Sequence, residues 1–247
     1  MKLFLLQSQA EVRRIFRNPY FVFWSLLMPL VFYFIFTNVV STGVPDQDEW
    51  NAHFLMSVTA FSVMGSSIMT LGIRLVQERT EGWTAYLETT PLPPVTYFTS
   101  KMAGQSVVHV FSIVFIFLAG RIINGVSLGA AEWFLSGLWI LTASLPFLAL
   151  GVMVGLMKRV DTASGISNLL YLALALTGGM WMPMEVLPEA LQMIGKWLPA
   201  YPYGSGAWGI IRGSAPEWRH IGLLIGYLAL FLGAAVYIRK RQDAMQT

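Results

Sequence analysis

The chain has no cysteine and little charge. The absence of cysteine among its 247 residues excludes disulfides, thiol chemistry and two-cysteine metal motifs. Only 12% of the residues are charged, about half of the ~25% found in soluble domains. Hydrophobic residues make up 55% of the sequence, and the mean hydropathy is +0.60. So little polar surface cannot cover a soluble globule of this size, and we expect a chain embedded in a lipid bilayer.

Several signatures of catalysis and ion-coupled transport are also missing. There is no G-x-x-x-x-G-K-[ST] sequence, so the chain does not bind ATP by a P-loop. The metalloprotease motif H-E-x-x-H and the nucleophile motif G-x-S-x-G are absent. Acidic residues are missing from the apolar runs, which argues against a proton- or sodium-coupled carrier and against an enzyme. We expect no catalytic residue, bound metal or cofactor on this chain, and no nucleic-acid partner.

Six apolar runs are long enough to cross the hydrocarbon core of a bilayer, which takes about 20 helical residues. Short connections join them, so we predict one membrane domain over residues 1–247. The predicted fold is all-α, with six transmembrane helices. The predicted spans are Pro19–Val40, Phe54–Val76, Met102–Gly120, Trp133–Met157, Gly165–Met182 and Ile221–Ile238.

Basic residues are distributed unequally between the two sides of this topology. With the N-terminus in the cytoplasm, 12 of the 16 Lys and Arg residues fall in cytoplasmic segments. An excess of Lys and Arg marks the cytoplasmic side of a membrane protein, where these residues also face anionic lipid. We therefore predict that both termini are cytoplasmic. The four basic residues on the outer side are Arg121, Lys196, Arg212 and Arg219.

Residues 1–18 precede the first span and mix polar with apolar side chains. Leu5, Val12 and Phe16 fall on one helical face, and Asn18-Pro19 ends the pattern. We predict an amphipathic helix that lies along the inner membrane surface. The alternative is a plain cytoplasmic extension of the first span. The basic residues of the predicted interface helix are Arg13, Arg14 and Arg17.

A polar segment, residues 77–100, separates the second and third spans. Thr80 can cap the amides of a short helix, and Glu81 favours the positive N-terminal end of that helix. Prolines, beginning with Pro91, stop the helix and return the chain to the membrane. Trp83, Tyr86 and Leu87 then share one face. The polar side chains expected to point to water or to a partner are Glu78, Arg79, Glu81 and Glu88.

The segment between the fifth and sixth spans, residues 183–218, is rich in proline and aromatic residues. Between its prolines, Glu189–Leu198 and Ser205–Arg212 have the character of short helices. They are apolar but too short to cross a bilayer. We expect re-entrant or interfacial helices on the outer side, because irregular backbone is tolerated at membrane depth only where protein or water covers it.

Isolated polar residues give weaker signals. Asp46, Asp48 and Glu49 lie near His53, which invites a metal hypothesis, but a solvated outer loop is the interpretation we favour. His109 lies within the third span and is the one candidate for a functional group inside the membrane. We favour a structural role in which it pairs with a serine of its own helix or with a neighbouring helix.

Two pairs of glycines are spaced four residues apart on apolar helices. They are Gly151 with Gly155, and Gly222 with Gly226. Such spacing allows close contact between helices. We favour packing within one subunit over a dimer face.

Two signatures give the sequence a resemblance to a known family. The first is Glu78-Arg79-(two residues)-Gly82-(one)-Thr84-(two)-Leu87-(three)-Pro91-Leu92, followed by Lys101. The second runs from Gly178-Gly179 through Pro183, Pro188 and Pro199 to Arg212-Gly213. Over its whole length the chain resembles the membrane subunits of type-2 ABC exporters of bacteria. It departs from the family pattern at Trp83, which separates the usual Gly-Thr pair.

The resemblance implies a half-permease in the bacterial plasma membrane. Such a subunit pairs with a second permease subunit, for which we favour a homodimer over a heterodimer. Two separate ATP-binding subunits carry the ATP and Mg²⁺ and dock on the cytoplasmic side. The exported compounds of the family are drugs, antibiotics, lipids or polysaccharides, and here we expect a hydrophobic or amphiphilic molecule. The docking residues implied by the resemblance are Glu78, Arg79, Glu81, Gly82, Trp83, Thr84, Tyr86, Leu87 and Pro91, with Arg13, Arg14 and Arg17 of the interface helix.

Two other functions compete with this one. A membrane-embedded enzyme acting on lipid would need polar residues that converge at one depth, and the sequence shows no such set. A sensor or immunity protein that binds a membrane-active compound without pumping it would not need the polar segment between the second and third spans.

Overall fold

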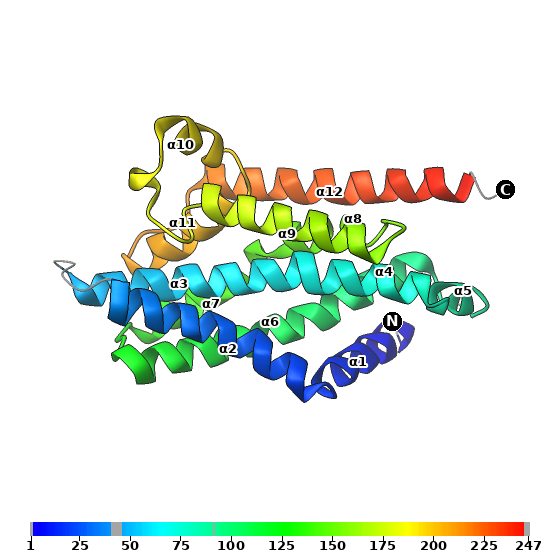
Figure 1. Cartoon of the computed structure of the whole chain (residues 1–247), viewed down its shortest axis with the longest axis horizontal. Coiled ribbons are helices and arrows are strands. Elements are labelled where there is room, and N and C mark those ends of the chain that lie inside the picture. Colours follow the sequence, from blue (N-terminus) through cyan, green and yellow to red (C-terminus); the bar gives the residue numbers. More distant parts are fainter. Residues whose placement is uncertain (1, 41–45, 91, 245–247) are drawn as a thin grey trace.

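The computed structural model describes residues 2–40, 46–90 and 92–244, and every regular element within these ranges is helical (Figure 1). The first half of the chain forms α1 (Lys2–Phe16), α2 (Pro19–Ile35), η1 (Phe36–Val40), α3 (Gln47–Gly65), η2 (Ser66–Leu71), α4 (Gly72–Thr80), α5 (Trp83–Glu88) and α6 (Pro94–Asn124). The second half forms α7 (Ala130–Ala143), α8 (Leu145–Val154), α9 (Val160–Thr177), η3 (Met184–Val186), α10 (Glu189–Gly195), α11 (Ala200–Ile211) and α12 (Trp218–Ala244). The prediction of an all-α fold is confirmed for the described residues.

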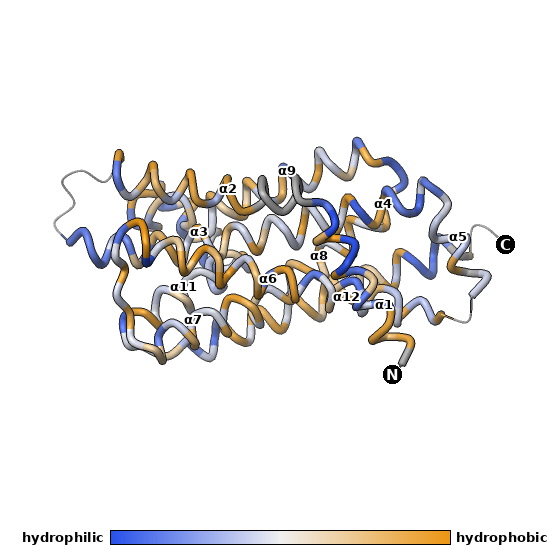
Figure 2. Tube along the Cα trace, turned by 90° about the horizontal axis from the view of Figure 1, so that it is seen from below, coloured by the Kyte–Doolittle hydropathy of each residue, from blue (hydrophilic) through white to orange (hydrophobic). Residues whose placement is uncertain are grey.

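The long helices run side by side, and the short helices α5 and α10 lie at two opposite ends (Figure 1). The start of α1, the end of α12 and the short helix α5 lie at one end, and α10 and the start of α3 lie at the other. Hydrophilic residues gather toward these ends, and apolar residues predominate between them (Figure 2). This distribution is typical of helices that cross an apolar layer.

The centre of the bundle is one continuous helix formed by α3, η2 and α4. This helix spans Gln47–Thr80, and 67% of the residues in its most apolar 18-residue stretch are buried, against 11% in the corresponding stretch of α12. Met56, Met64 and Ile68 are fully buried in its interior. Because this helix is apolar on all sides, it packs against neighbours on all sides, whereas α12 lies at the periphery.

Four helices in the described part of the chain are long and apolar enough to cross a membrane: Gln47–Thr80, Pro94–Asn124, Ala130–Val154 and Trp218–Gln242. They contain most or all of the predicted second, third, fourth and sixth spans. The predicted first span contains a shorter apolar helix, Leu26–Val40. The predicted fifth span was placed too far along the chain, because α9 ends at Thr177 and Gly179 then adopts a positive φ of 73°.

The middle of the central helix is π-helical over η2, and it faces the buried His109 of α6. The Nε2 atom of His109 lies 3.5 Å from the Oγ of Ser67. Ser106, by contrast, donates to a carbonyl of its own helix. Of the two partners expected for His109, the neighbouring helix is therefore confirmed. Single π-helical turns frequently occur at functional positions in helices.

The end of the molecule opposite α5 is built around α11. The buried Tyr203 donates its hydroxyl to the carbonyl of Ile140, at 3.2 Å, and its own carbonyl accepts from the Trp139 indole, at 2.8 Å. Short helices between the fifth and sixth predicted spans are thus confirmed as α10 and α11, with shifted limits. Asp46 caps the first turn of α3 at this end, and no group of three or more His, Asp or Glu side chains in the described residues is arranged to hold a metal.

Candidate coupling site

The predicted coupling segment forms a helical hairpin at one end of the bundle (Figure 1). Helix α4 continues through Thr80, and α5 begins after Gly82, which has a positive φ of 79°. The hydroxyl of Thr80 donates back to the carbonyl of Gln77, so the prediction that Thr80 caps the short helix is wrong. Glycine suits this turn because it has no Cβ, whereas L-residues rarely adopt a positive φ.

Two aromatic side chains of α5 face outward. The rings of Trp83 and Tyr86 lie 5.4 Å apart, and the two side chains are 42% and 61% exposed. Leu87 is half-buried and packs against the base of the hairpin, in a cluster with Leu75 and Tyr97. The predicted shared face therefore holds for the aromatic pair, while Leu87 anchors the helix.

Other predicted docking residues flank this pair. Glu81 and Gly82 are exposed at the turn, and Thr84 is half-buried. Pro91 lies outside the described residues. Pro93 is extended, and Pro94 then starts α6 at a position where its missing N–H costs nothing.

Glu78 is buried, which corrects the expectation that it points to water or to a partner. Its side chain is 1% exposed, and its two carboxylate oxygens accept from three donors. Oε1 lies 2.6 Å from the ammonium of Lys101 and 2.5 Å from the guanidinium of Arg14. Oε2 accepts from the Tyr97 hydroxyl at 2.5 Å. The physical reason is that α1 and α6 pack over this end of α4 and cover the carboxylate.

Lys101 extends this network to α1. Its ammonium lies 2.5 Å from Oε1 of Glu11, and the Lys101 and Glu11 side chains are 1% and 6% exposed. Gly104, one turn along α6, permits the approach, because a Cβ there would lie 2.9 Å from the Cβ of Glu11. We call the set Glu11, Arg14, Glu78, Tyr97 and Lys101 the buried ion network. It joins α1, α4 and α6.

The charges in the buried ion network depend on one another. Two carboxylates are matched by one ammonium and one guanidinium in direct contact. A buried charge is tolerated only when it is paired, and removal of one partner leaves the other without compensation. The network is therefore a rigid connection between three helices at the base of α5.

Arg79 also points inward rather than to water. Its guanidinium donates to the carbonyls of Leu156, at 2.9 Å, and Gly155, at 3.3 Å. Gln242 of α12 donates to the same Leu156 carbonyl at 3.0 Å. These carbonyls follow the C-terminal end of α8, where a cation is favourable. Arg79 therefore joins α4 to the ends of α8 and α12.

The interface helix α1 is confirmed as a helix, and it packs along α6 through both polar and apolar side chains. Glu11 and Ile15 are its buried residues, while Leu5 is 58% exposed. Of the three predicted docking arginines, Arg14 is half-exposed in the buried ion network, and Arg13 and Arg17 are exposed. The exposed apolar side chains of α1 are Leu3, Leu5, Leu6 and Phe16.

Three members of the buried ion network, Glu11, Tyr97 and Lys101, were missed as site residues. Glu11 and Lys101 are charged residues near predicted membrane segments, and Lys101 also follows the first family signature. Their pairing depends on the contact between α1 and α6, which no local pattern specifies.

Comparisons with known proteins identify the family of the chain. The family model described as "ABC-2 family transporter protein" matches residues 38–237. The chain is 60% identical over 239 residues to the Bacillus subtilis (strain 168) protein named "Putative transport permease YvfS", covering 97% of this chain and 98% of that protein. The match includes α5, Glu78, Tyr97 and Lys101, and it spans both ends of the bundle. The chain therefore belongs to the ABC-2 family of transporter membrane proteins.

Proposed function

We propose that the chain is the membrane half of an ATP-driven exporter and that α5 docks a separate ATP-binding subunit. In this proposal two copies of the chain enclose the pathway, and each receives one ATP-binding subunit. Membership of the ABC-2 permease family supports the transport role. The observation that carries the docking role is the exposed Trp83–Tyr86 pair on α5, because exposed aromatic residues are typical of protein interfaces.

The buried ion network gives docking a mechanical consequence. Helix α5 is fixed to α4 by the turn at Gly82 and by the packing of Leu87. Glu78 and Arg79 connect α4 to α1, α6, α8 and α12. A displacement of α5 by a partner is therefore passed to several helices rather than absorbed in a flexible loop. In this revised role Glu78 and Arg79 transmit force and do not touch the partner.

The topology we propose has six spans with both termini on the cytoplasmic side, the side of α5. The position of the start of α1, the end of α12 and α5 at one end of the bundle supports an even number of crossings (Figure 1). Helix α2 and helix α9 supply the first and fifth spans. We expect the cargo to be hydrophobic or amphiphilic, such as a drug, an antibiotic or a lipid-like molecule.

The test compares one aspartate substitution at each end of the molecule. The tagged chain is purified from its native bacterium, and the ATPase activity of the recovered complex is measured. Trp83→Asp should abolish recovery of the ATP-binding subunit, because a charge replaces an aromatic contact. Trp218→Asp is the matched control, since Trp218 is exposed and lies at the start of α12, away from α5. Equal recovery with both variants would show that α5 is not the docking element.

A further inference from the structure

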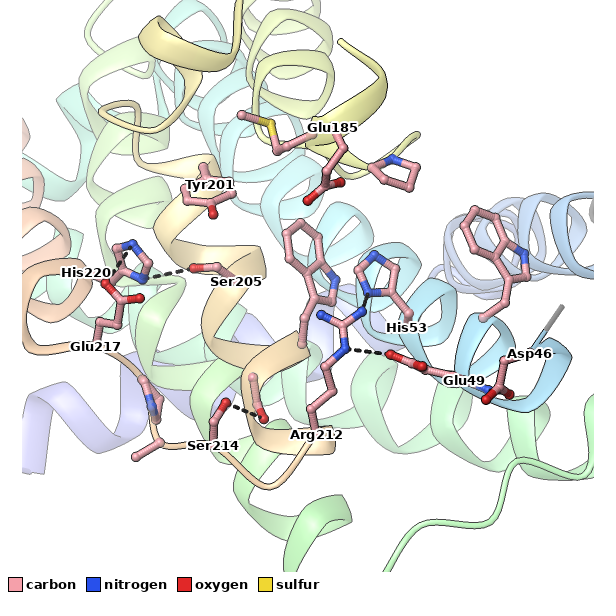
Figure 3. Close-up of a pocket in the computed structure, with 17 residues that line it drawn as sticks. Asp46, Glu49, His53, Glu185, Tyr201, Ser205, Arg212, Ser214, Glu217 and His220 are labelled. Carbon is pink, nitrogen blue, oxygen red and sulfur yellow. Dashed lines mark hydrogen bonds and ion pairs between the residues drawn. The ribbon is translucent and has the colours of Figure 1, made fainter. Parts of the chain in front are cut away.

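A cavity of about 540 Å³ opens at the end of the molecule opposite α5 (Figure 3). Its walls come from the start of α3, the segment around η3, helix α11 and the start of α12. A volume of this size is within the range of sites that hold a drug-sized ligand.

The rim of the cavity is acidic. Four carboxylates line it, Asp46, Glu49, Glu185 and Glu217, against the single guanidinium of Arg212. Arg212 is already engaged, because its Nε atom lies 2.8 Å from Oε1 of Glu49. Figure 3 shows Glu185 and Glu217 on opposite sides of Tyr201. The rim therefore carries a net negative charge, because Arg212 balances only one of the four carboxylates.

The inner wall of the cavity is a continuous row of rings. His53 stacks on Trp208 with ring centres 4.7 Å apart, and the rings of Trp50 and His53 are also stacked, with centres 6.4 Å apart. Tyr201 lies edge-to-face with Trp208, at 6.5 Å, and with His220, at 5.7 Å. We call these five residues the aromatic wall. The faces of such rings carry partial negative charge, which attracts cations.

Hydrogen bonds hold the aromatic wall in place. The indole of the buried Trp208 donates to Oγ of Ser57 at 2.9 Å, and the hydroxyl of Ser205 lies 3.1 Å from Nδ1 of His220. Burial, together with the nearby carboxylates of Glu185 and Glu217, raises the pKa of the Tyr201 hydroxyl above its ordinary value. Tyr201 therefore stays neutral and presents an intact phenol ring beside two carboxylates.

We propose that this cavity is a binding site for a hydrophobic organic cation, such as an amphiphilic amine or a quaternary ammonium compound. The aromatic wall receives the apolar body and the charge of the ligand, and Glu185 and Glu217 supply the opposite charge. An anion would meet three carboxylates that Arg212 does not balance. The described residues offer no group of three or more ligating side chains for a metal ion. The proposal goes beyond the docking of an ATP-binding subunit and does not depend on it.

The experiment measures binding of tetraphenylphosphonium to the purified chain in phosphatidylcholine nanodiscs by equilibrium dialysis, with empty nanodiscs subtracted. The wild-type chain should bind saturably, and tetraphenylborate, which has the same shape and the opposite charge, should not. The double variant Glu185→Gln/Glu217→Gln should bind about three- to tenfold more weakly, as expected for two solvent-exposed charges. Tyr201→Leu should also weaken binding, by about fivefold, whereas Tyr201→Phe keeps the ring and should bind like the wild type.

The matched control is Glu189→Gln, an exposed carboxylate on α10 that does not line the cavity. Its affinity should equal that of the wild type. Glu185 and Glu217 are exposed, so their substitution leaves the packed interior intact, and circular dichroism checks the fold. Equal affinity of the wild type and the double variant, or equal binding of tetraphenylborate, would overturn the proposal.

Discussion

Buried charge at the base of α5 shows how single residues determine the behaviour of the site. Lys101 is 2% exposed and lies between the carboxylates of Glu11 and Glu78. The cost of burying these groups is offset only while all of them are present. Substitution of any residue that connects α1, α4 and α6 is therefore expected to be strongly destabilising.

The first prediction concerns this ammonium. Lys101→Met should destabilise the protein by about 3–5 kcal/mol, because two buried carboxylates lose their shared partner. Thermal unfolding of the purified protein in detergent measures the change. Arg159→Ala is the control, because Arg159 pairs with Asp161 at 3.7 Å with both side chains largely exposed. The unfolding temperature of Arg159→Ala should equal that of the wild type within experimental error. A Lys101→Met protein as stable as the wild type would contradict the buried ion network.

At the scale of the elements, identical glycine motifs have different roles. A Cβ on Gly151 of α8 would overlap the backbone oxygen of Ser67 in η2, and a Cβ on Gly155 would lie 2.6 Å from the Cβ of Leu75. Gly226 of α12, in contrast, has no atom of another element within 4 Å of that position. The first motif packs helices within the subunit, as expected, and the second motif is open.

The second prediction follows from this contrast. Gly151→Ala should destabilise the bundle by about 1–3 kcal/mol, since α8 and the central helix must move apart to accept one methyl group. Gly226→Ala adds the same methyl group to an open face and should leave the unfolding temperature unchanged. If the two variants unfold at the same temperature, the close packing of α8 against η2 at Gly151 is contradicted.

At the scale of the whole molecule, the arrangement of the two ends of the bundle predicts which surfaces of the protein are accessible from each side of the membrane. Helix α5 and helix α10 lie at opposite ends of the bundle (Figure 1). The two ends also differ in chemistry, since one presents the exposed aromatic pair of α5 and the other presents the acidic cavity. We propose that the first end binds a protein partner and the second a small ligand.

The third prediction tests the orientation in the membrane. Because the chain has no cysteine, a single introduced cysteine reports its own position. Glu189→Cys on α10 should react with a membrane-impermeant maleimide in intact cells, and Glu81→Cys beside α5 should react only after the cells are opened. Both side chains are exposed, so reactivity depends on the side of the membrane. Labelling of Glu81→Cys in intact cells would reverse the proposed topology.

The sequence by itself determined the class of the protein and the approximate position of most helices. Long apolar runs without acidic residues define membrane helices because unpaired backbone groups and charges are costly in lipid. The motif from Glu78 to Leu92 led to the family that the comparisons then showed. These properties are local, since each depends on residues close together in the chain.

The tertiary structure alone decided which polar residues are available to a partner. Glu78 and Arg79 belong to the same polar segment as Trp83 and Tyr86, but α1, α6, α8 and α12 cover the first pair and leave the second exposed. The tertiary structure likewise brings the start of α3, helix α11 and the start of α12 together around one cavity. The physical reason is that burial and charge pairing depend on contacts between distant segments, and helical periodicity gives no information about those contacts.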